Sequence, residues 1–277
     1  MKLIKALNNS ALIVEKDGLE KVVLGKGIGF GLKPGDFVDV NKVDRIFSVN
    51  SEDKNRLIAL IQEIPDQYLE VSEEIIAYAR GVLKKEISDT IYISLTDHLY
   101  FIFERYHQNI MPSNPFKYDV QRFYEKEYKI GKKAVELLED EFQVKLNDDE
   151  AAAIAMHIIN AEFDMDTYRS IEMLQLMEGI IQVIRYQLKI DWNEESMNFQ
   201  RLMTHLKFFV QRIMLKVQYE EENPLYDAVK EQYPKAYECV LRIKEFIEKK
   251  YMFHVSKDEC TYLMIHIQRL MSRETEE

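Results

Sequence analysis

Two segments of this sequence are copies of one another: residues 114–128 read NPFKYDVQRFYEKEY, and residues 223–237 read NPLYDAVKEQYPKAY. A shift of 109 residues superimposes the two Asn-Pro pairs, a valine, two tyrosines and a lysine. Similarity at a fixed offset is the signature of a repeated structural unit. Copies of about 105–110 residues favour two domains rather than a solenoid, because a unit of this length can enclose its own core.

The histidines repeat with the same module. Two of them are each followed by leucine and, seven residues later, by arginine: His98 with Arg105, and His205 with Arg212. Two others each stand seven residues after a glutamate: His157 after Glu150, and His266 after Glu259. Four of the six histidines therefore form two matched pairs. Because histidine changes its charge near neutral pH, a duplicated pair indicates a module with a regulatory or chemical purpose.

The first 47 residues have the pattern of a small β domain. Asn, Gly and Pro separate short apolar or β-branched runs, which predict strands at residues 3–4, 11–14, 21–24 and 37–38. Asp17-Gly18 lies between two of these runs and predicts a hairpin turn. The segment carries eight Lys/Arg and six Asp/Glu, which gives it a net charge of +2. Because the whole chain has a net charge of −11, the remaining residues carry −13. A mildly basic head on an acidic body suggests a division of labour.

Helical spacing replaces the strand pattern after about residue 52. One apolar stripe with a period of 3.6 residues runs from Val71 to Leu83. Similar spacing predicts helices at residues 148–162, 169–189, 196–217 and 234–250. We therefore expect a small N-terminal antiparallel β domain and two homologous all-α helical bundles, with boundaries at 1–56, 57–168 and 169–277. A head of fewer than about 60 residues buries little surface alone, so we expect it to dimerise.

Composition favours a cytoplasmic protein without membrane insertion. No apolar run approaches the roughly 20 residues that span a bilayer, and the N-terminus lacks the features of a signal peptide. The two cysteines, Cys239 and Cys260, do not have metal-ligand spacing, which fits a reducing compartment.

The glycine-rich stretch, residues 25–35, has three interpretations. A nucleotide-binding loop is disfavoured because the Gly-Lys-Ser/Thr ending is missing. A strand-and-turn region would need glycine for its backbone geometry. A nucleic-acid surface would use glycine for close approach to phosphate, lysine for charge, aromatic rings for stacking and asparagine amides for base edges. Its candidate residues are Lys5, Lys26, Lys33, Phe30, Asn8 and Asn9.

The paired histidines also have several interpretations. They could be partly buried imidazoles held by carboxylates, with Asp97 and Glu150 as candidate partners. A zinc site of Asp97, His98 and His157 is disfavoured because no compact H-E-x-x-H arrangement exists. A hydrolytic triad is disfavoured because no serine lies in a nucleophile-elbow context. Phosphorylation by a donor protein would add a multiply charged anion near an arginine and could re-dock or separate acidic domains.

Four phenylalanines follow the first histidine of each copy. At this helical spacing we expect them in the core: Phe101, Phe103, Phe208 and Phe209.

Several motifs resemble one known family. The head MKLIKALNNS…KVVLGKGIGFGLKPGD is similar to the co-antiterminator RNA-binding domain of the BglG/SacY/LicT-type transcriptional antiterminators of bacterial sugar operons. Four further segments resemble the histidine motifs of two phosphotransferase-system regulation domains (PRDs): SLTDH at 94–98, AMHIINAE at 155–162, THLKFF at 204–209 and IHIQR at 265–269. The resemblance covers essentially the whole chain.

The resemblance implies a regulator rather than an enzyme, with no metal or cofactor. Its head would dimerise and bind an RNA hairpin in the leader of a nascent transcript, which prevents the overlapping terminator from forming. The positions that contact RNA in the family correspond here to Lys5, Asn8, Asn9, Ser10, Gly25, Lys26, Gly27 and Phe30. Ser10 and Lys26 stand where the family often has asparagine and arginine. Serine reaches less far and lysine lacks the bidentate fork, so we expect a different hairpin affinity or preference.

The resemblance also implies two phosphorylation inputs with opposite effects. His98 and His157 would receive phosphate from a sugar-specific permease component (enzyme II) when the sugar is absent, which switches the protein off. His205 and His266 would receive it from the carrier protein HPr, which switches the protein on. Each phosphate adds about −1.5 to −2 charge, so the second input is expected to tighten the homodimer and the first to loosen it.

Three alternatives belong to other classes of protein. One is a metal-dependent hydrolase that uses the paired histidines. A second is a PRD-containing DNA-binding activator, which would need a helix-turn-helix head. The third is a scaffold with structural histidines.

Overall fold

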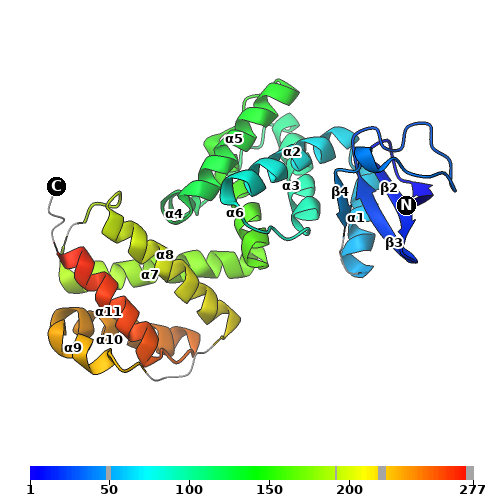
Figure 1. Cartoon of the computed structure of the whole chain (residues 1–277). Coiled ribbons are helices and arrows are strands. Elements are labelled where there is room, and N and C mark those ends of the chain that lie inside the picture. Colours follow the sequence, from blue (N-terminus) through cyan, green and yellow to red (C-terminus); the bar gives the residue numbers. More distant parts are fainter. Residues whose placement is uncertain (48–50, 191, 218–222, 273–277) are drawn as a thin grey trace. The chain divides into compact units, whose positions relative to one another are not determined.

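The computed structural model describes residues 1–47, 51–190, 192–217 and 223–272, and its chain divides into two compact units, Met1–Thr167 and Tyr168–Glu277 (Figure 1). Within the described residues, the first unit holds a four-stranded sheet followed by helices α1 to α6. The second unit is built from α7 to α11. The predicted order, a small β domain followed by helices, is confirmed.

The sheet is antiparallel, with the strands side by side in chain order. Its members are β1 Lys2–Ala6, β2 Ala11–Lys16, β3 Leu19–Leu24 and β4 Arg45–Phe47. The predicted hairpin is confirmed, because Lys16 pairs with Leu19 across the two-residue turn. Asp17 and Gly18 have φ values of 55° and 74°, the positive φ that the tightest hairpin turns need.

The strand predicted at residues 37–38 was wrong. Residues 35–38 run beside β1 with a few backbone hydrogen bonds, but only one bridge forms, between Lys2 and Phe37. Phe37 points to solvent, whereas Val38 enters the core. The fourth strand lies further along, at Arg45–Phe47, where the ring of Phe47 is buried.

A small apolar core holds the head together. Its buried members come from the sheet and the loops that close it: Leu3, Leu12, Val14, Val23, Ile28 and Val38. The head then packs on the first helical module, because the ring of Phe47 meets that of Tyr92 edge-on at 4.8 Å between centroids. Arg45 Nη2 also lies 2.5 Å from Asp89 Oδ1. The head and the first module therefore share one unit.

The helices follow the predicted repeat. The first unit has α1 Ser51–Glu63, α2 Asp66–Leu83, α3 Ile91–His107, α4 Lys117–Phe123, α5 Glu125–Phe142 and α6 Asp148–Phe163. The second has α7 Thr167–Leu188, α8 Met197–Leu215, α9 Tyr226–Gln232, α10 Pro234–Tyr251 and α11 Lys257–Met271. The short helices α4 and α9 begin at 117 and 226, the same offset of 109 that relates the copied segments.

The copied Asn-Pro pairs start the short helices. The side-chain oxygen of Asn114 accepts a hydrogen bond from the backbone of Phe116, and Asn223 accepts one from Leu225. Asparagine stabilises turns in this way, by bonding to the backbone two residues on. The repeated motif is therefore a pair of identical local turns.

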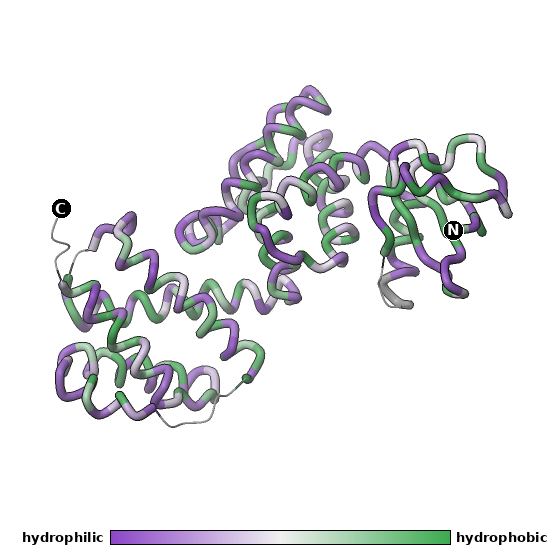
Figure 2. The backbone as a smooth tube through the Cα atoms, viewed as in Figure 1, coloured by the Kyte–Doolittle hydropathy of each residue, from purple (hydrophilic) through white to green (hydrophobic). Residues whose placement is uncertain are grey.

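The amphipathic faces predicted from the sequence are visible along the helices (Figure 2). Two of the four phenylalanine predictions were correct, because Phe103 and Phe209 are buried. Phe101 and Phe208 are each 48% exposed, so those two were wrong. Since successive helical residues are turned by about 100°, Phe101 and Phe208 lie on other faces than Phe103 and Phe209. No helix in the described part of the chain has both the length and the apolar character to cross a membrane.

Candidate functional site

The head brings most of its predicted RNA-contacting residues together in two adjoining loops. The backbone of Gly25 donates a hydrogen bond to Ser10 O, and that of Gly29 donates one to Asn9 O, each at 3.0 Å. The β1–β2 connection therefore lies against the loop that follows β3. Asn9, Lys26 and Phe30 are exposed, and the Phe30 side chain is 81% exposed. Lys5 is exposed on β1.

Glycine is required by backbone geometry at two positions in this surface. Gly27 has a φ of +62°, a conformation that other residues adopt at a cost. A Cβ on Gly25 would lie 1.8 Å from the backbone oxygen of Lys42. The predicted turn is therefore confirmed, whereas the strand β3 ends at Leu24, before the first of these glycines. The turn is compatible with the nucleic-acid interpretation, since the same geometry exposes the loop.

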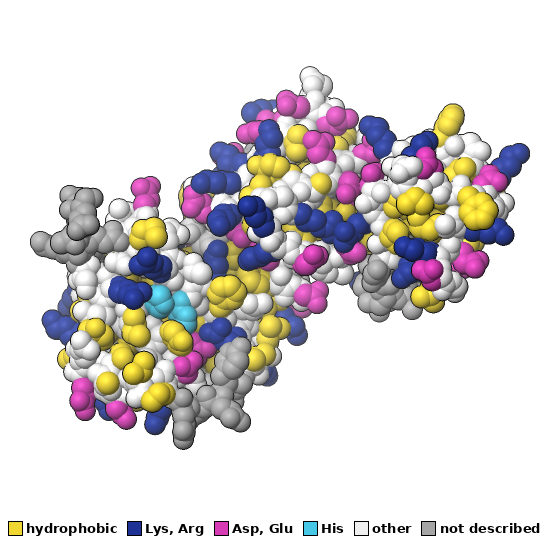
Figure 3. Space-filling view, in the orientation of Figure 1, with side chains coloured by type: hydrophobic (Ala, Val, Ile, Leu, Met, Phe, Trp, Pro, Cys, Tyr) yellow, Lys and Arg dark blue, Asp and Glu magenta, His cyan; other side chains and the backbone are white. Residues whose placement is uncertain are grey.

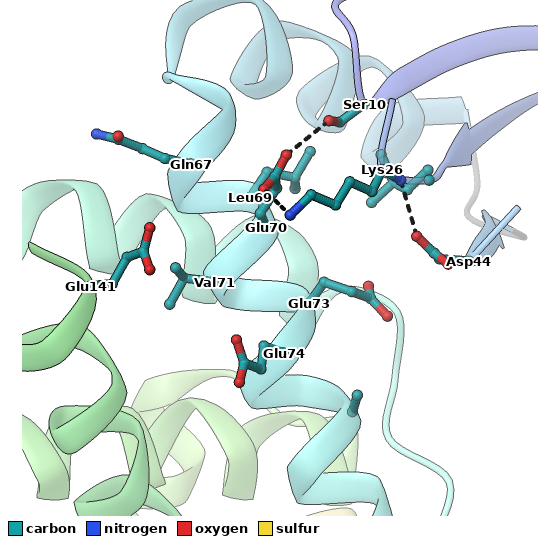
Figure 4. A pocket seen from close by; sticks show the side chains of 13 residues that line it. Ser10, Lys26, Asp44, Gln67, Leu69, Glu70, Val71, Glu73, Glu74 and Glu141 are labelled. Atoms are coloured by element: carbon teal, nitrogen blue, oxygen red, sulfur yellow. Dashed lines mark hydrogen bonds and ion pairs between the residues drawn. The ribbon is translucent and has the colours of Figure 1, made fainter. Parts of the chain in front are cut away.

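Three residues of the surface meet the first turns of α2, and Figure 4 shows two of them, Ser10 and Lys26, beside Glu70. Asn8 Nδ2 donates a hydrogen bond to Asp66 Oδ1 at 2.8 Å, and Ser10 Oγ donates one to Glu70 Oε1 at 3.2 Å. Lys26 Nζ lies 3.6 Å from Glu70 Oε2. Sequence reasoning missed both acidic residues, because Asp66 is 58 residues from Asn8 and Glu70 is 60 residues from Ser10.

The first histidine pair forms one cluster between α3 and α6. The ring centroids of His98 and His157 are 4.6 Å apart. Glu150 lies between a histidine and an arginine: its Oε2 is 3.4 Å from His98 Nε2, and its Oε1 accepts a hydrogen bond from Arg105 Nη2 at 3.2 Å. Of the two candidate carboxylates, Asp97 and Glu150, it is Glu150 that lies inside the cluster. Glu150 contacts His98 of the other helix, although His157 is closer to it in the sequence.

The second histidine pair repeats this arrangement between α8 and α11. The rings of His205 and His266 are 5.1 Å apart. Glu259 Oε2 is 3.7 Å from His205 Nε2, and Glu259 Oε1 accepts a hydrogen bond from Arg212 Nε at 2.7 Å. Histidine atoms reach the surface of this unit beside basic side chains (Figure 3).

Local sequence explains why each cluster assembles. Seven residues are close to two helical turns, so His98 and Arg105 share one face of α3, as Glu150 and His157 share one face of α6. A helix cap then fixes each glutamate in the first turn. Asn147 accepts a hydrogen bond from the backbone of Glu150, and Ser256 accepts one from that of Glu259.

The first cluster combines a neutral imidazole with an ionised carboxylate. Burial, and then the charge of His98, lowers the pKa of His157 to about 3. Burial pushes the pKa of Glu150 upward, but His98 and Arg105 outweigh it, so this pKa lies below its usual range. At neutral pH His157 therefore keeps the lone pair that a nucleophile needs.

The histidine pKa values are lowered in the second cluster as well, but the pKa of its glutamate shifts in the opposite direction. Burial, followed by the charges of His266 and Arg212, lowers the pKa of His205 to about 4. Burial also lowers the pKa of His266. Burial raises the pKa of Glu259, and Arg212 offsets this only in part. Both imidazoles are therefore neutral at neutral pH.

Metal binding has no structural support within the described residues. They contain no group of three or more His, Cys, Asp or Glu side chains placed to hold an ion. Asp97, His98 and His157 thus do not form the three-ligand zinc site considered above.

Comparison with known proteins accounts for both the head and the clusters. The CAT RNA binding domain matches residues 1–56, and the PRD domain matches residues 73–161 and again residues 178–270. The transcription antiterminator LicT of Bacillus subtilis (strain 168) is 38% identical over 276 residues, which cover 99% of this chain and 100% of LicT. This chain belongs to the LicT-type antiterminator family.

Two further relatives agree with this assignment. The beta-glucoside operon antiterminator of Dickeya chrysanthemi is 36% identical over 98% of this chain and 97% of its own length. The crystal structure of GlcT CAT-PRDI is 29% identical, with a TM-score of 0.54, and it covers 58% of this chain and 97% of the GlcT fragment. The first matched PRD of this antiterminator contains His98 and His157, and the second contains His205 and His266.

Acid is expected to destabilise this antiterminator through His205. Its pKa is about 4 in the folded chain and 6.5 without the fold, so the unfolded chain binds more protons between these values. Stability therefore falls as the pH drops through this window, by about 2 kcal/mol between about pH 7 and pH 5. Urea unfolding at both pH values measures the free energy of unfolding. Between them, this free energy should fall by about 2 kcal/mol less in His205→Gln than in the parent chain. If the free energy of unfolding depended on pH equally in the two proteins, His205 would not be the group that makes the chain sensitive to acid.

Proposed function

We propose that this chain is an RNA-binding antiterminator of a sugar-utilisation operon. It binds an RNA hairpin in the leader of the nascent transcript and thereby prevents the overlapping terminator from forming. The observation that carries this proposal is the assembled head surface, in which the Asn8–Ser10 turn lies against the glycine loop within a matched CAT RNA binding domain. Such a protein acts as a regulator and not as an enzyme.

Each side chain of this surface has a role that suits unpaired RNA. Phe30 offers an exposed ring on which a base can stack. Asn8 and Asn9 offer amide edges for hydrogen bonds to bases, and Lys5 and Lys26 offer charge to phosphates. Ser10, Gly25 and Gly27 complete the set by shaping the two loops.

The chain's organisation follows from this proposal. We assign residues 1–56 to the RNA-binding domain, 57–168 to the first PRD and 169–277 to the second. The head acts as part of a homodimer, since a sheet of this size gains stability from a second copy. Its work on nascent transcripts places the protein in the cytoplasm, and no membrane insertion is involved.

The histidine clusters are proposed as phosphorylation sites. A neutral imidazole nitrogen attacks phosphorus, a new N–P bond forms, and the bond between phosphorus and the donor protein's group breaks. The permease component (enzyme II) would serve His98 and His157, and HPr would serve His205 and His266. Nδ1 of His157 and Nδ1 of His266 are buried without a hydrogen-bond partner among the described residues. Transfer to either nitrogen therefore requires the covering side chains to move.

The Glu–Arg pairs give each phosphate a local consequence. Glu150 and Glu259 hold Arg105 and Arg212 beside the histidines. A phosphoryl group is a more highly charged acceptor for arginine than a carboxylate, and it repels the carboxylate. After phosphorylation, we expect the arginine to leave the glutamate and bind the phosphoryl group. This change of partner is expected to shift one helix of the cluster against the other.

Binding to a leader hairpin tests the function directly. Phe30→Ala is expected to weaken hairpin binding by about 5- to 150-fold, which corresponds to the ~1–3 kcal/mol of one stacked base. Asn8→Ala is expected to weaken it by about tenfold through lost base contacts. A gel shift with hairpins from flanking operons measures both.

Phe37→Ala is the matched control, because Phe37 is 79% exposed on the same domain and lies outside the proposed surface. We expect it to bind like the parent chain. If the parent chain binds none of these hairpins while its head is folded, the proposed function is wrong.

A further inference from the structure

Acidic residues at the start of α2 occupy part of the surface that would bind RNA. Asn8, Ser10 and Lys26 are three of the eight proposed contacts, and each meets Asp66 or Glu70 at the start of α2. Figure 4 shows the contacts of Ser10 and Lys26 with Glu70. All five residues lie within one compact unit.

Both polar groups of the Asn8 amide already have partners. Its Oδ1 accepts the backbone N–H of Ser10 at 2.9 Å, while its Nδ2 donates to Asp66 Oδ1 at 2.8 Å. Reading a base through paired hydrogen bonds needs both the donor and the acceptor of the amide. A base therefore gains access to Asn8 only when Asp66 is displaced.

Glu70 opposes RNA in two ways. Its carboxylate accepts from Ser10 and lies beside Lys26, a cation that would otherwise attract phosphate. Glu70, Ser10 and Lys26 line one pocket between the head and α2. Glu73 and Glu74 of α2 and Glu141 of α5 line the same pocket. An RNA backbone approaching this side of the head would meet a row of like charges.

The contacts differ in strength. The Lys26–Glu70 pair is exposed, with 86% and 40% of the side chains accessible, so water and salt weaken it. The hydrogen bond between Asn8 and Asp66 is partly buried and charge-assisted, which makes it the stronger competitor.

The acidic helix is joined directly to a helix of the first histidine cluster. Tyr68 lies between Asp66 and Glu70 on α2, and its ring packs against Tyr100 and Phe103 of α3 with centroids 5.5 Å apart in both cases. The same helix carries His98. A shift of α3 therefore reaches the acidic residues through one buried ring.

We propose that Asp66 and Glu70 form an interaction surface whose partner is the RNA-binding face of the head, so that α2 and the hairpin compete for Asn8, Ser10 and Lys26. The structure described here is then the masked form of the protein, and RNA binding requires the head to leave α2. This inference rests on the proposed function, because it needs the same head residues to contact RNA.

The test compares two charge-matched variants of the full chain by fluorescence anisotropy with a leader hairpin. Asp66→Asn/Glu70→Gln removes the masking contacts and is expected to bind about tenfold more tightly than the parent chain. Glu63→Gln/Glu86→Gln removes the same charge from two exposed residues that do not line this pocket, and no hydrogen bond or ion pair joins either residue to the head among the described residues. We expect it to bind within about twofold of the parent chain.

Three outcomes would overturn the proposal. Equal affinity of Asp66→Asn/Glu70→Gln and the parent chain, with Asn8→Ala still weakening binding, leaves the function intact and excludes masking. Equal tightening in both double variants shows a general effect of charge. Absence of hairpin binding in every variant removes the proposed function, and the masking with it.

A single variant guards against a folding effect. Asp66 lies in the first turn of α2, where its charge stabilises the helix, but Glu70 is exposed beyond that turn. Glu70→Gln alone is expected to keep the melting temperature of the parent chain and still bind the hairpin about threefold more tightly. Unchanged affinity in this folded variant would contradict the role of Glu70.

Discussion

Replacing His205 and His266 together with alanine is expected to abolish phosphate incorporation into the second PRD. Both imidazoles of that cluster are neutral at neutral pH, and they are its proposed phosphoryl acceptors. Because alanine has no nucleophilic nitrogen, the loss should be complete. Activation of antitermination under phosphorylating conditions should disappear with it. Acid-labile phosphate, counted after incubation with phosphoenolpyruvate and the carrier proteins including HPr, measures the first effect, and a terminator-reporter assay measures the second.

The two histidines outside the pairs provide the matched control. His107 and His254 are exposed, and neither belongs to a His–His–Glu–Arg cluster. His107→Ala/His254→Ala removes the same number of imidazoles, and we expect normal phosphate incorporation and normal activation. If the His205→Ala/His266→Ala chain were still activated like the parent chain, the assignment of the second PRD as the activating input would be wrong.

Gly131→Ala is expected to destabilise the first unit by about 2 kcal/mol or more. Gly131 lies inside α5, where α5 crosses α6, and a Cβ at this position would stand 2.0 Å from the backbone oxygen of Ala151. The two helices would have to separate, and such overpacking outweighs the gain of about 1 kcal/mol from replacing glycine within a helix. Thermal unfolding should show a melting temperature lower by about 5 °C.

Gly81→Ala is the matched control, because the same substitution is made there at a helix position where no other atoms lie close by. Gly81 lies on the exposed side of α2, and a Cβ there meets no atom within 4 Å. We expect it to stabilise the chain by about 0.5–1 kcal/mol. Because Ala151 follows Glu150 on α6, Gly131→Ala should also disturb the first histidine cluster and leave the second unchanged. Equal stability of the two alanine variants would contradict the close packing of α5 on α6.

Local patterns in the sequence predicted most of the fold. The apolar period placed helices within a few residues of α6, α7, α8 and α10, and the copied segments gave the offset between the two PRDs. Asp17-Gly18 gave the β2–β3 hairpin for the same reason, since turn geometry depends on the turn residues themselves. The prediction failed at residues 37–38, where a short apolar pair lies beside β1 without forming a strand.

The sequence identified the candidate site residues, but it did not identify the residues that they contact. Spacing alone brought out the histidines, the arginines seven residues after them and the glutamates seven residues before them, because a helix places such residues on one face. It could not show that Glu150 faces His98, since these residues stand on different helices. Nor could it show that Glu259 bridges His205 and Arg212, for the same reason.

The sequence by itself determined the order of the domains, the duplication and the two sets of candidate residues, because each depends on periodicity or on a short motif. Only the tertiary structure decided what those residues touch. The packing of α3 on α6 and of α8 on α11 assembled the His–His–Glu–Arg clusters. The docking of the head on α2 set Asn8 against Asp66, across 58 residues of chain. Contacts of that separation depend on how whole elements pack, and no local period encodes them.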